Sequence, residues 1–292
     1  MLYNKPLDEL ITERTSVRSY REESLTASMI EEIEAYTRQL DDPFSGRVRF
    51  QLLFTGESEE GGKDQSTGKS APAYALGTYG VIKGAEVFIG AAVKSGPLAQ
   101  VSLGYQFERL VLYLTSLGLG TCYLGGTYNK SEFGRAMGVK ENGDELFPVV
   151  SPVGWPAEKR RMMDTIMRAA AGSKNRKEWD KLFFDRNFHV PLSYELAGKY
   201  SAPLEMVRLA PSASNKQPWR VVREGDYFHF FQAGAADSRE ESVDVHRVDM
   251  GIALCHFHLA VQEAELPGRF ALVSPPIPRS DNCRYIASWQ MG

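Results

Sequence analysis

Cysteine is scarce in this chain. Only three cysteines occur in 292 residues, and no two of them form a CxxC pair. A disulfide framework or a structural zinc site needs more cysteines at closer spacing, so the sequence predicts neither. Residues 1–12 carry polar and charged side chains throughout, without the apolar core of a secretory signal. Sparse, unpaired thiols suit a reducing compartment, and we therefore expect a cytoplasmic protein.

A strong charge of one sign and a long apolar run are also lacking. The formal net charge of -3 is too small to indicate nucleic acid or a membrane surface as a partner. The longest uncharged apolar stretch, residues 110–126, is interrupted by Thr115, Ser116 and several glycines. It predicts a buried helix followed by a turn, not a membrane span. With 43% apolar and 24% charged residues, the composition is that of a globular protein with a packed core.

The chain contains an apparent internal repeat. Residues 103–124 align with residues 250–271 at an offset of 147, which brings Gly104 opposite Gly251. Both segments place apolar residues at helical spacing around most of the circumference, which is typical of a central, buried helix. Chance similarity between two such helices is the alternative explanation of this alignment when it is taken alone.

A second alignment lies earlier in the chain, at an offset of 168. It brings Arg18 opposite Arg186 and Pro43 opposite Pro211. Two alignments in the same order favour duplication over chance. The first half is longer, because residues 56–70, rich in glycine, serine and charge, predict an exposed loop.

We therefore predict an α+β fold of two tandem half-units, residues 1–157 and 182–292, which form a pseudo-dimer within one chain. Mainly antiparallel sheets are flanked by helices. Helices are expected over residues 25–40, 103–117, 194–208 and 251–264, and strands over 48–55, 85–93, 148–154, 219–222, 227–232 and 285–289. The connecting segment, residues 158–181, holds eight basic against four acidic residues. A solvated helix or a phosphate partner explains this excess equally well.

An arginine-rich segment, residues 14–20 (RTSVRSY), is the first candidate for chemistry. In an extended segment alternate side chains share a face, so Arg14, Ser16 and Arg18 point the same way. Two guanidinium groups and a hydroxyl can bind a phosphate through charge-assisted hydrogen bonds. The alternative is a basic strand on the surface.

Two further segments suggest a ligand with a flat polar ring. Residues 210–219 (APSASNKQPW) predict a rigid loop with many hydrogen-bonding groups, which suits a heteroaromatic ligand; a structural loop with capping serines is the alternative. Residues 118–126 (GLGTCYLGG) follow a helix. A helix cap accounts for Gly118, whereas Gly125 and Gly126 allow backbone amides to approach a ligand closely.

These motifs together resemble the nitroreductase family, most closely the branch in which two half-units are fused. The similarity covers nearly the whole chain and includes residues 152–156 (PVGWP), and the 210–219 loop is its most specific part. It implies FMN as the cofactor, bound between the two half-units. The implied FMN-binding residues are Arg14, Ser16, Arg18, Leu124, Gly125, Gly126, Lys174, Arg176, Pro211, Ser212, Ala213, Ser214, Asn215 and Gln217. Within this set the backbone of the two glycines would lie at flavin N5, and the two basic residues of the connecting segment would contact the phosphate.

The two halves do not match the family pattern equally. Residues 43–47, the first half's counterpart of the serine-asparagine loop, have lost the pattern. In the second half's counterpart of the arginine segment, residues 182–186, only Arg186 remains. We therefore expect one complete site per chain, in a monomer or a homodimer.

The function implied by the resemblance is NAD(P)H-dependent reduction of a nitroaromatic, quinone or enone acceptor through FMN. No side chain is required as an acid or base. A non-catalytic flavin-binding protein is the main alternative, and an FMN-free interaction module is another. The motifs do not separate these acceptors from disulfides, flavins or halogenated substrates. His246 and Arg247, which precede the second central helix, are either part of the substrate pocket or purely structural.

Overall fold

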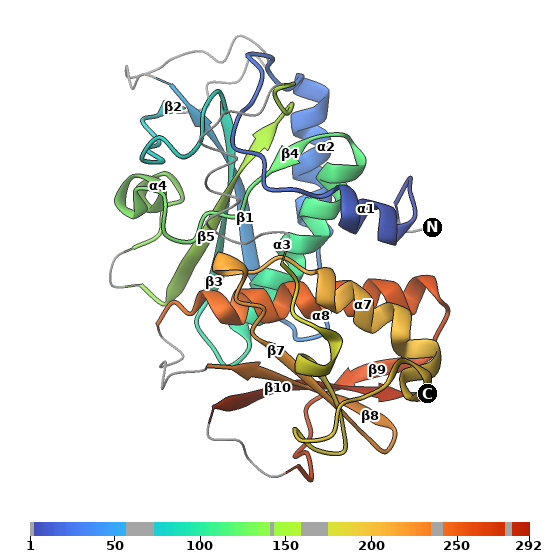
Figure 1. Cartoon of the computed structure of the whole chain (residues 1–292). Helices are drawn as coiled ribbons and strands as arrows, with labels where there is room; N and C mark the ends of the chain where they lie inside the picture. Colours follow the sequence, from blue (N-terminus) through green and yellow to red (C-terminus); the bar gives the residue numbers. More distant parts are fainter. Residues whose placement is uncertain (1–2, 57–72, 141–142, 159–174, 235–241, 278–281) are drawn as a thin grey trace.

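The computed structural model describes residues 3–56, 73–140, 143–158, 175–234, 242–277 and 282–292. Two five-stranded sheets lie at opposite ends of the molecule, and two long helices, α3 (Ala99–Ser116) and α8 (Val245–Glu263), pack between them (Figure 1). The predicted α+β class is confirmed. The connecting segment and the 56–70 loop lie mostly outside the described residues.

The first sheet has the strand order β2-β1-β3-β5-β4. Its strands are β1 (Val48–Thr55), β2 (Ala73–Tyr74), β3 (Val87–Lys94), β4 (Gly120–Thr121) and β5 (Glu145–Gly154). The edge strand β2 runs parallel to β1, and the other neighbours are antiparallel.

The second sheet repeats this plan in the order β6-β7-β8-β10-β9. Its strands are β6 (Phe183–Asp185), β7 (Trp219–Glu224), β8 (Tyr227–Ala233), β9 (Gly268–Ala271) and β10 (Cys283–Met291). Again one edge strand, β6, is parallel to its neighbour and the remaining pairs are antiparallel. The two sheets therefore share one architecture.

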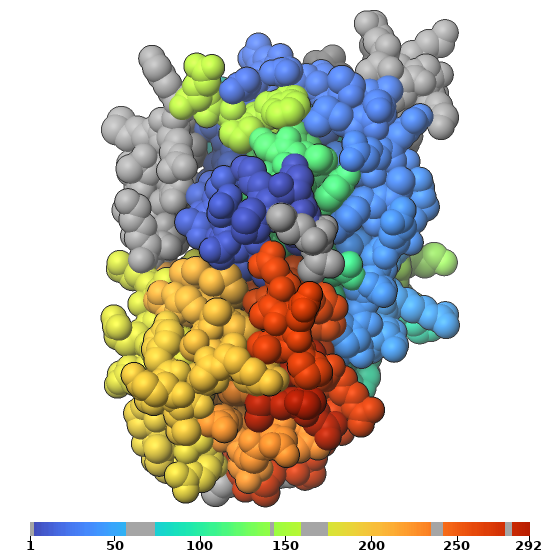
Figure 2. Space-filling model, turned by 90° about the vertical axis from the view of Figure 1, so that its right-hand side faces the viewer, coloured from blue at the N-terminus to red at the C-terminus, as the bar shows by residue number. Residues whose placement is uncertain are grey.

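The remaining helices are shorter. They are α1 (Leu7–Glu13), α2 (Ala27–Arg38), α4 (Lys130–Ala136), α6 (Tyr194–Ala197) and α7 (Ser201–Leu209). Thr26 caps α2 by accepting a hydrogen bond from the Met29 amide, as its position in the sequence predicts. The single helix predicted over 194–208 is divided, because Gly198 adopts a φ of 56° between α6 and α7. In Figure 2, α1 covers the boundary between the halves beside α7.

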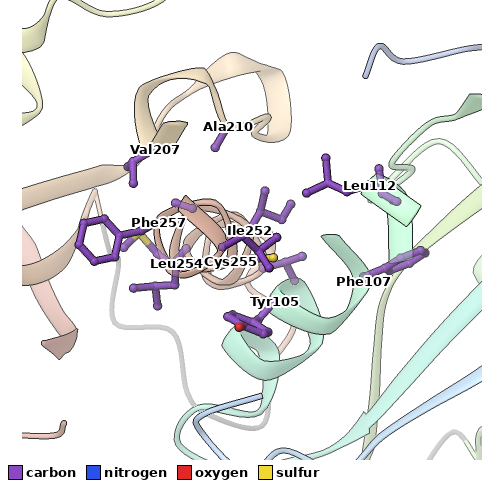
Figure 3. Packing of buried hydrophobic residues seen from close by; sticks show 14 of the residues in the cluster. Tyr105, Phe107, Leu112, Val207, Ala210, Ile252, Leu254, Cys255 and Phe257 are labelled. Atoms are coloured by element: carbon purple, nitrogen blue, oxygen red, sulfur yellow. The ribbon is translucent and has the colours of Figure 1, made fainter. Parts of the chain in front are cut away.

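The two central helices meet backbone to backbone. A Cβ atom added to Gly104 of α3 would overlap the carbonyl oxygen of Val248, and one added to Gly251 of α8 would overlap the carbonyl oxygen of Val101. The contacts are reciprocal, and each glycine and each carbonyl has its counterpart 147 residues along the chain. The sequence alignment of the two helices is therefore also an alignment in space. Around this crossing the apolar side chains of both helices form a continuous core (Figure 3).

The second sequence alignment fails in part. Ser16, in the arginine segment, pairs with Thr121 of β4. Its counterpart by sequence, Phe184, lies in β6 and pairs with Val222 of β7, at the opposite edge of the equivalent sheet. The assignment of residues 182–186 as a degenerate arginine segment is therefore wrong. A match of a few residues between two short segments does not determine which sheet edge each segment joins.

Because the two backbones touch at this crossing, we predict that one added methyl group will strongly lower the free energy of unfolding. In Gly251→Ala, the new methyl group meets backbone atoms that cannot rotate away, so the free energy of unfolding should fall by about 1–3 kcal/mol. Urea denaturation measures this. Gly134→Ala in α4 is the matched control: nothing lies within 4 Å of its added Cβ, and helix propensity should raise stability by about 0.5–1 kcal/mol. Equal behaviour of the two variants would contradict the described crossing.

Candidate functional site

The arginine segment runs along β4 at the end of α1. The Val17 amide donates to the Thr121 carbonyl at 2.8 Å, and Gly120 permits this approach because a Cβ there would crowd the Val17 side chain. Among the described residues, Nε of Arg14 and both Nε and Nη1 of Arg18 are buried without a hydrogen-bond acceptor. Buried cationic donors without partners are costly, so this arrangement fits a bound anion.

A third arginine, from the end of the connecting segment, joins this group. Burial, followed by the nearby positive charges of Arg14 and Arg208, lowers the pKa of Arg176 to about 10. Its Nη1 donates to Asn215 Oδ1 at 2.7 Å, and its Nη2 donates to the Leu209 carbonyl at 2.8 Å. The first half, the connecting segment and the loop of the second half therefore converge at one place.

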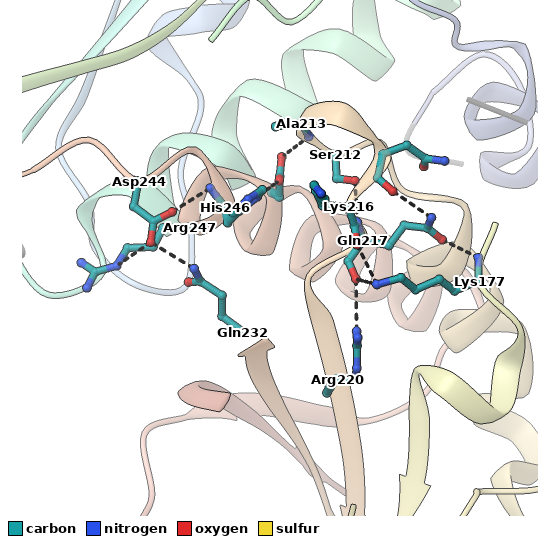
Figure 4. A network of polar contacts seen from close by, with 12 residues as sticks. Lys177, Ser212, Ala213, Lys216, Gln217, Arg220, Gln232, Asp244, His246 and Arg247 are labelled. Carbon is teal, nitrogen blue, oxygen red and sulfur yellow. Dashed lines mark hydrogen bonds and ion pairs between the residues drawn. The ribbon is translucent and has the colours of Figure 1, made fainter. Parts of the chain in front are cut away.

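The 210–218 loop is held in an unusual conformation. Ser214, Asn215 and Gln217 have positive φ angles of 49°, 53° and 48°. For residues other than glycine, each such conformation costs about 1–3 kcal/mol and persists only where the surroundings impose it. The Gln217 amide donates to Ser212 Oγ at 2.9 Å, which closes the turn (Figure 4).

Two loop residues that we expected to face a ligand have a different position. The side chain of Gln217 is buried, accepts from the Lys177 amide at 2.7 Å and donates to the Asn175 carbonyl at 3.2 Å. The Asn215 side chain also donates to the Asn175 carbonyl, at 2.8 Å, while it accepts from Arg176. Both side chains hold the loop to the connecting segment. Ser214 is exposed and remains available to a ligand, whereas the backbone amides of Ala213 and residues 215–217 donate within the protein.

The glycine segment also faces the second half. Leu124 pairs with Val150 through two backbone hydrogen bonds of 2.9 and 3.1 Å. Gly125 then passes the start of α8, where an added Cβ would lie 3.2 Å from Val245 Cγ1. Gly126 is exposed. The expected phosphate contact Lys174 lies outside the described residues.

A histidine–aspartate pair connects α8 with the loop. His246 Nδ1 lies 2.9 Å from Asp249 Oδ2, and Asp249 Oδ1 accepts from the Ala213 amide at 3.0 Å (Figure 4). The hydrogen bond to Asp249 raises the pKa of His246, against the opposing effect of burial. Burial raises the pKa of Asp249, and its two donors oppose that shift. Asp249 was missed in the sequence, although its spacing of three residues from His246 on a helix was a usable signal.

A second buried network lies below the glycine segment. Tyr123 donates to Glu108 Oε2 at 2.7 Å, and Glu108 Oε1 lies 2.8 Å from His256 Nε2. The other ring nitrogen of His256 donates to the Met206 carbonyl at 2.9 Å. Glu108 and His256 are completely buried. Sequence reasoning did not identify this link between the halves, because it depends on how α3 and α8 cross.

The equivalent place on the other side of the crossing is filled. Phe44, next to the counterpart of Pro211, packs against Phe270 at 5.3 Å and against Tyr105 at 6.2 Å between ring centroids. Ser102 Oγ donates to Asp42 Oδ1 at 2.9 Å beneath it. Aromatic and hydrogen-bonded side chains thus occupy the position that corresponds, across the crossing, to the 210–218 loop.

Two kinds of feature are absent from the described part of the chain. No group of three or more histidine, cysteine, aspartate or glutamate residues there is arranged to hold a metal ion. No helix that the structure describes is long and apolar enough to cross a membrane.

Comparison with known proteins gives one family. The family model described as "Putative TM nitroreductase" matches residues 6–261. The crystal structure of a "putative nitroreductase" from Thermotoga maritima MSB8 is 19% identical, with a TM-score of 0.59 over 99% of this chain and 95% of that chain. This similarity extends over both sheets and shows a shared fold. No curated protein matches.

Two smaller structures match about half of the chain. A nitroreductase family protein from Clostridium novyi NT is 15% identical, with a TM-score of 0.40 over 55% of this chain and 91% of that chain. A nitroreductase with bound FMN from Bacteroides fragilis NCTC 9343 is 16% identical, with a TM-score of 0.39 over 55% of this chain and 92% of that chain.

The unpartnered arginines predict that inorganic phosphate binds the flavin-free protein. Phosphate at 100 times its Kd should stabilise the folded state by about 2.7 kcal/mol, because it binds only the folded chain. Thermal unfolding in phosphate and in chloride of equal ionic strength measures this. Arg18→Ala should abolish most of the extra thermal stability that phosphate gives over chloride. Arg135→Ala, which changes an exposed residue of α4, should retain it. Equal responses of the two variants would show that phosphate acts elsewhere.

Proposed function

Because this chain belongs to the nitroreductase family, we propose that it is an FMN-dependent oxidoreductase that uses NAD(P)H to reduce a small electron-poor organic acceptor. The observation that carries the proposal is the convergence of Arg14, Arg176 and Asn215, which come from three separate parts of the chain. An FMN site between two half-units, as expected for the nitroreductase family, requires such a convergence. Nitroaromatic, quinone and enone compounds are the proposed acceptors.

The phosphate end of the site is supported by charge and burial. Arg14 and Arg18 present buried, unpartnered donors, and Ser16 lies between them on the same extended segment. Arg176 adds a third positive charge close to Arg14. Its hydrogen bonds go to the neutral groups Asn215 Oδ1 and the Leu209 carbonyl. Burial and, after it, the positive charges of Arg14 and Arg208 lower the pKa of Arg176, and a bound phosphate dianion would offset both effects. Lys174 is proposed to contribute from the adjoining segment.

The ring end is proposed to lie between the loop and the glycine segment. Pro211, Ser212, Ala213 and Ser214 would form one wall, and the backbone of Leu124, Gly125 and Gly126 would approach N5. Asn215 and Gln217 would act indirectly, since they fix the loop in its strained conformation. FMN supplies the hydride chemistry when bound. This chain's residues bind it, orient it and exclude water from one side.

One FMN per chain follows from the difference between the two sides of the crossing. Phe44 and its aromatic neighbours fill the second position, and no arginine segment lies beside β9 in the described residues. Both walls of the remaining site belong to the same chain. A monomer is therefore sufficient for FMN binding. We also propose a cytoplasmic location.

We expect the purified protein to bind one equivalent of FMN and to lose its yellow colour on anaerobic addition of NADH or NADPH. Arg14→Ala should weaken FMN binding roughly 10- to 100-fold, the effect of about 1.5–3 kcal/mol for a charge-assisted hydrogen bond. Fluorescence titration measures the affinity, and Arg135→Ala is the control.

Each part of this proposal has its own contrary result. Two equivalents of FMN would contradict the closed second position. An unchanged affinity in Arg14→Ala would remove the phosphate assignment. Tight FMN binding without bleaching by either nicotinamide would instead identify a non-catalytic flavin-binding protein.

A further inference from the structure

The pair formed by His246 and Asp249 lies in the first turns of α8, the helix end that meets the glycine segment through Val245 and the 210–218 loop through Asp249. Val245, the residue before His246, packs against Gly125, where an added Cβ would lie 3.2 Å from Val245 Cγ1. Asp249 accepts a hydrogen bond from the backbone amide of Ala213. We propose that His246 is a catalytic proton donor to the reduced acceptor and that Asp249 is its positioning residue. This inference rests on the proposed function.

The geometry leaves one nitrogen of His246 available. Because a carboxylate can only accept, Nδ1 carries the hydrogen in its 2.9 Å contact with Asp249. The side chain of His246 is 30% exposed, whereas that of Asp249 is 6% exposed. Asp249 also accepts from Ala213, so the carboxylate cannot rotate without releasing the loop. The ring is therefore held through Nδ1, and no hydrogen bond to a described residue engages Nε2, which leaves this nitrogen for a substrate and for exchange of its proton with water.

The other side of the molecule provides an internal comparison. The reciprocal glycine contacts fix the equivalence of α3 and α8 at an offset of 147, which places Ala99 opposite His246 and Ser102 opposite Asp249. In the closed position Ser102 donates to Asp42, and Ala99 is a buried apolar residue. The side with the unpartnered arginines thus carries His246 and Asp249, whereas the filled side has the non-titratable Ala99 and Ser102 at the equivalent positions. A role in helix packing alone would not require this difference.

The acceptor class that suits this arrangement has a carbonyl conjugated to a double bond, as in enones and quinones. With an enone, the hydride that bound, reduced FMN would supply goes to the β-carbon and would form a C–H bond there. The electron pair of the C=C bond moves toward the carbonyl oxygen. The Nε2–H bond of His246 then breaks as an O–H bond forms on that oxygen. The acceptor gains two electrons, the flavin loses two, and water restores the proton of His246.

The pH dependence follows from the charges around His246. Asp249 and Asp244 on its own helix favour the protonated ring, and Lys216 of the 210–218 loop disfavours it. The nearby glycine segment contributes no charged side chain among residues 124–126. Since the net effect raises the pKa, the donor form persists to higher pH than in an ordinary histidine. Above that pKa, the rate of acceptor reduction should fall tenfold per pH unit.

The test separates the two half-reactions by stopped-flow absorbance, with 2-cyclohexen-1-one as the acceptor. In His246→Gln, reduction of the flavin by NAD(P)H should remain within about twofold, because no proton donor is needed there. Reoxidation by the enone should slow by about 10²–10⁴-fold and lose its pH dependence. His189→Gln, which changes an exposed histidine after β6, is the matched control and should behave as the unaltered protein.

A second readout does not depend on activity. Nitrogen-15 NMR of the full chain should show His246 protonated at Nδ1 when neutral, with a pKa above the ordinary histidine value. Asp249→Asn should reverse the tautomer, because its amide donates to the ring, and should lower the pKa of His246. In the same variant, saturated with added FMN, the pH profile of enone reduction should move to lower pH.

The contrary outcomes are distinct. If the flavin of the unaltered protein is not bleached by NAD(P)H, the proposed function fails. If bleaching is normal and His246→Gln reoxidises at the unaltered rate, the proton-donor role is overturned and the proposed function stands. An Asp249→Asn profile without a shift, despite an altered pKa by NMR, would equally overturn it.

Discussion

The structure depends on the contact between two helix backbones at Gly104 and Gly251. Each glycine receives a carbonyl oxygen of the opposite helix, from Val248 and Val101, so that no side chain separates the two backbones. This contact sets the distance between the sheets and the register of α3 against α8. In that register the buried side chains of Glu108 and His256 meet within the apolar core that both helices share. Everything that lies between the halves is positioned by this crossing.

A symmetric scaffold supports an asymmetric pair of sites. The crossing generates two equivalent positions, and the side chains at each position determine whether it is filled or open to a ligand. On one side lie a loop with a strained backbone and buried arginine atoms that have no hydrogen-bond partner. On the other, Phe44 and Phe270 pack together. The second position therefore contributes apolar burial to stability, while the first retains strain and unpaired charge, which are typical of a ligand site.

Local patterns predicted most of the fold. Helix caps such as Thr26 and the alternation within strands depend on neighbouring residues, and a sequence displays these directly. The family resemblance supplied the arginine segment and the loop. The failures are matters of tertiary arrangement: the sheet edge that β6 joins, the inward role of Gln217, and the contact of Asp249 with a loop 36 residues earlier. None of these is determined by spacing along the chain, because each depends on how separate elements are packed.

The glycine crossing also restricts how the molecule can move. Packed side chains can exchange rotamers and let two domains slide, but two backbones in direct contact have no such freedom. Rotation of one half against the other would drive the Val248 carbonyl into Gly104 or pull it away from the shared core. Hinged closure of the halves is therefore blocked. Molecules must instead enter and leave the proposed site past its exposed segments, such as those that carry Gly126 and Ser214.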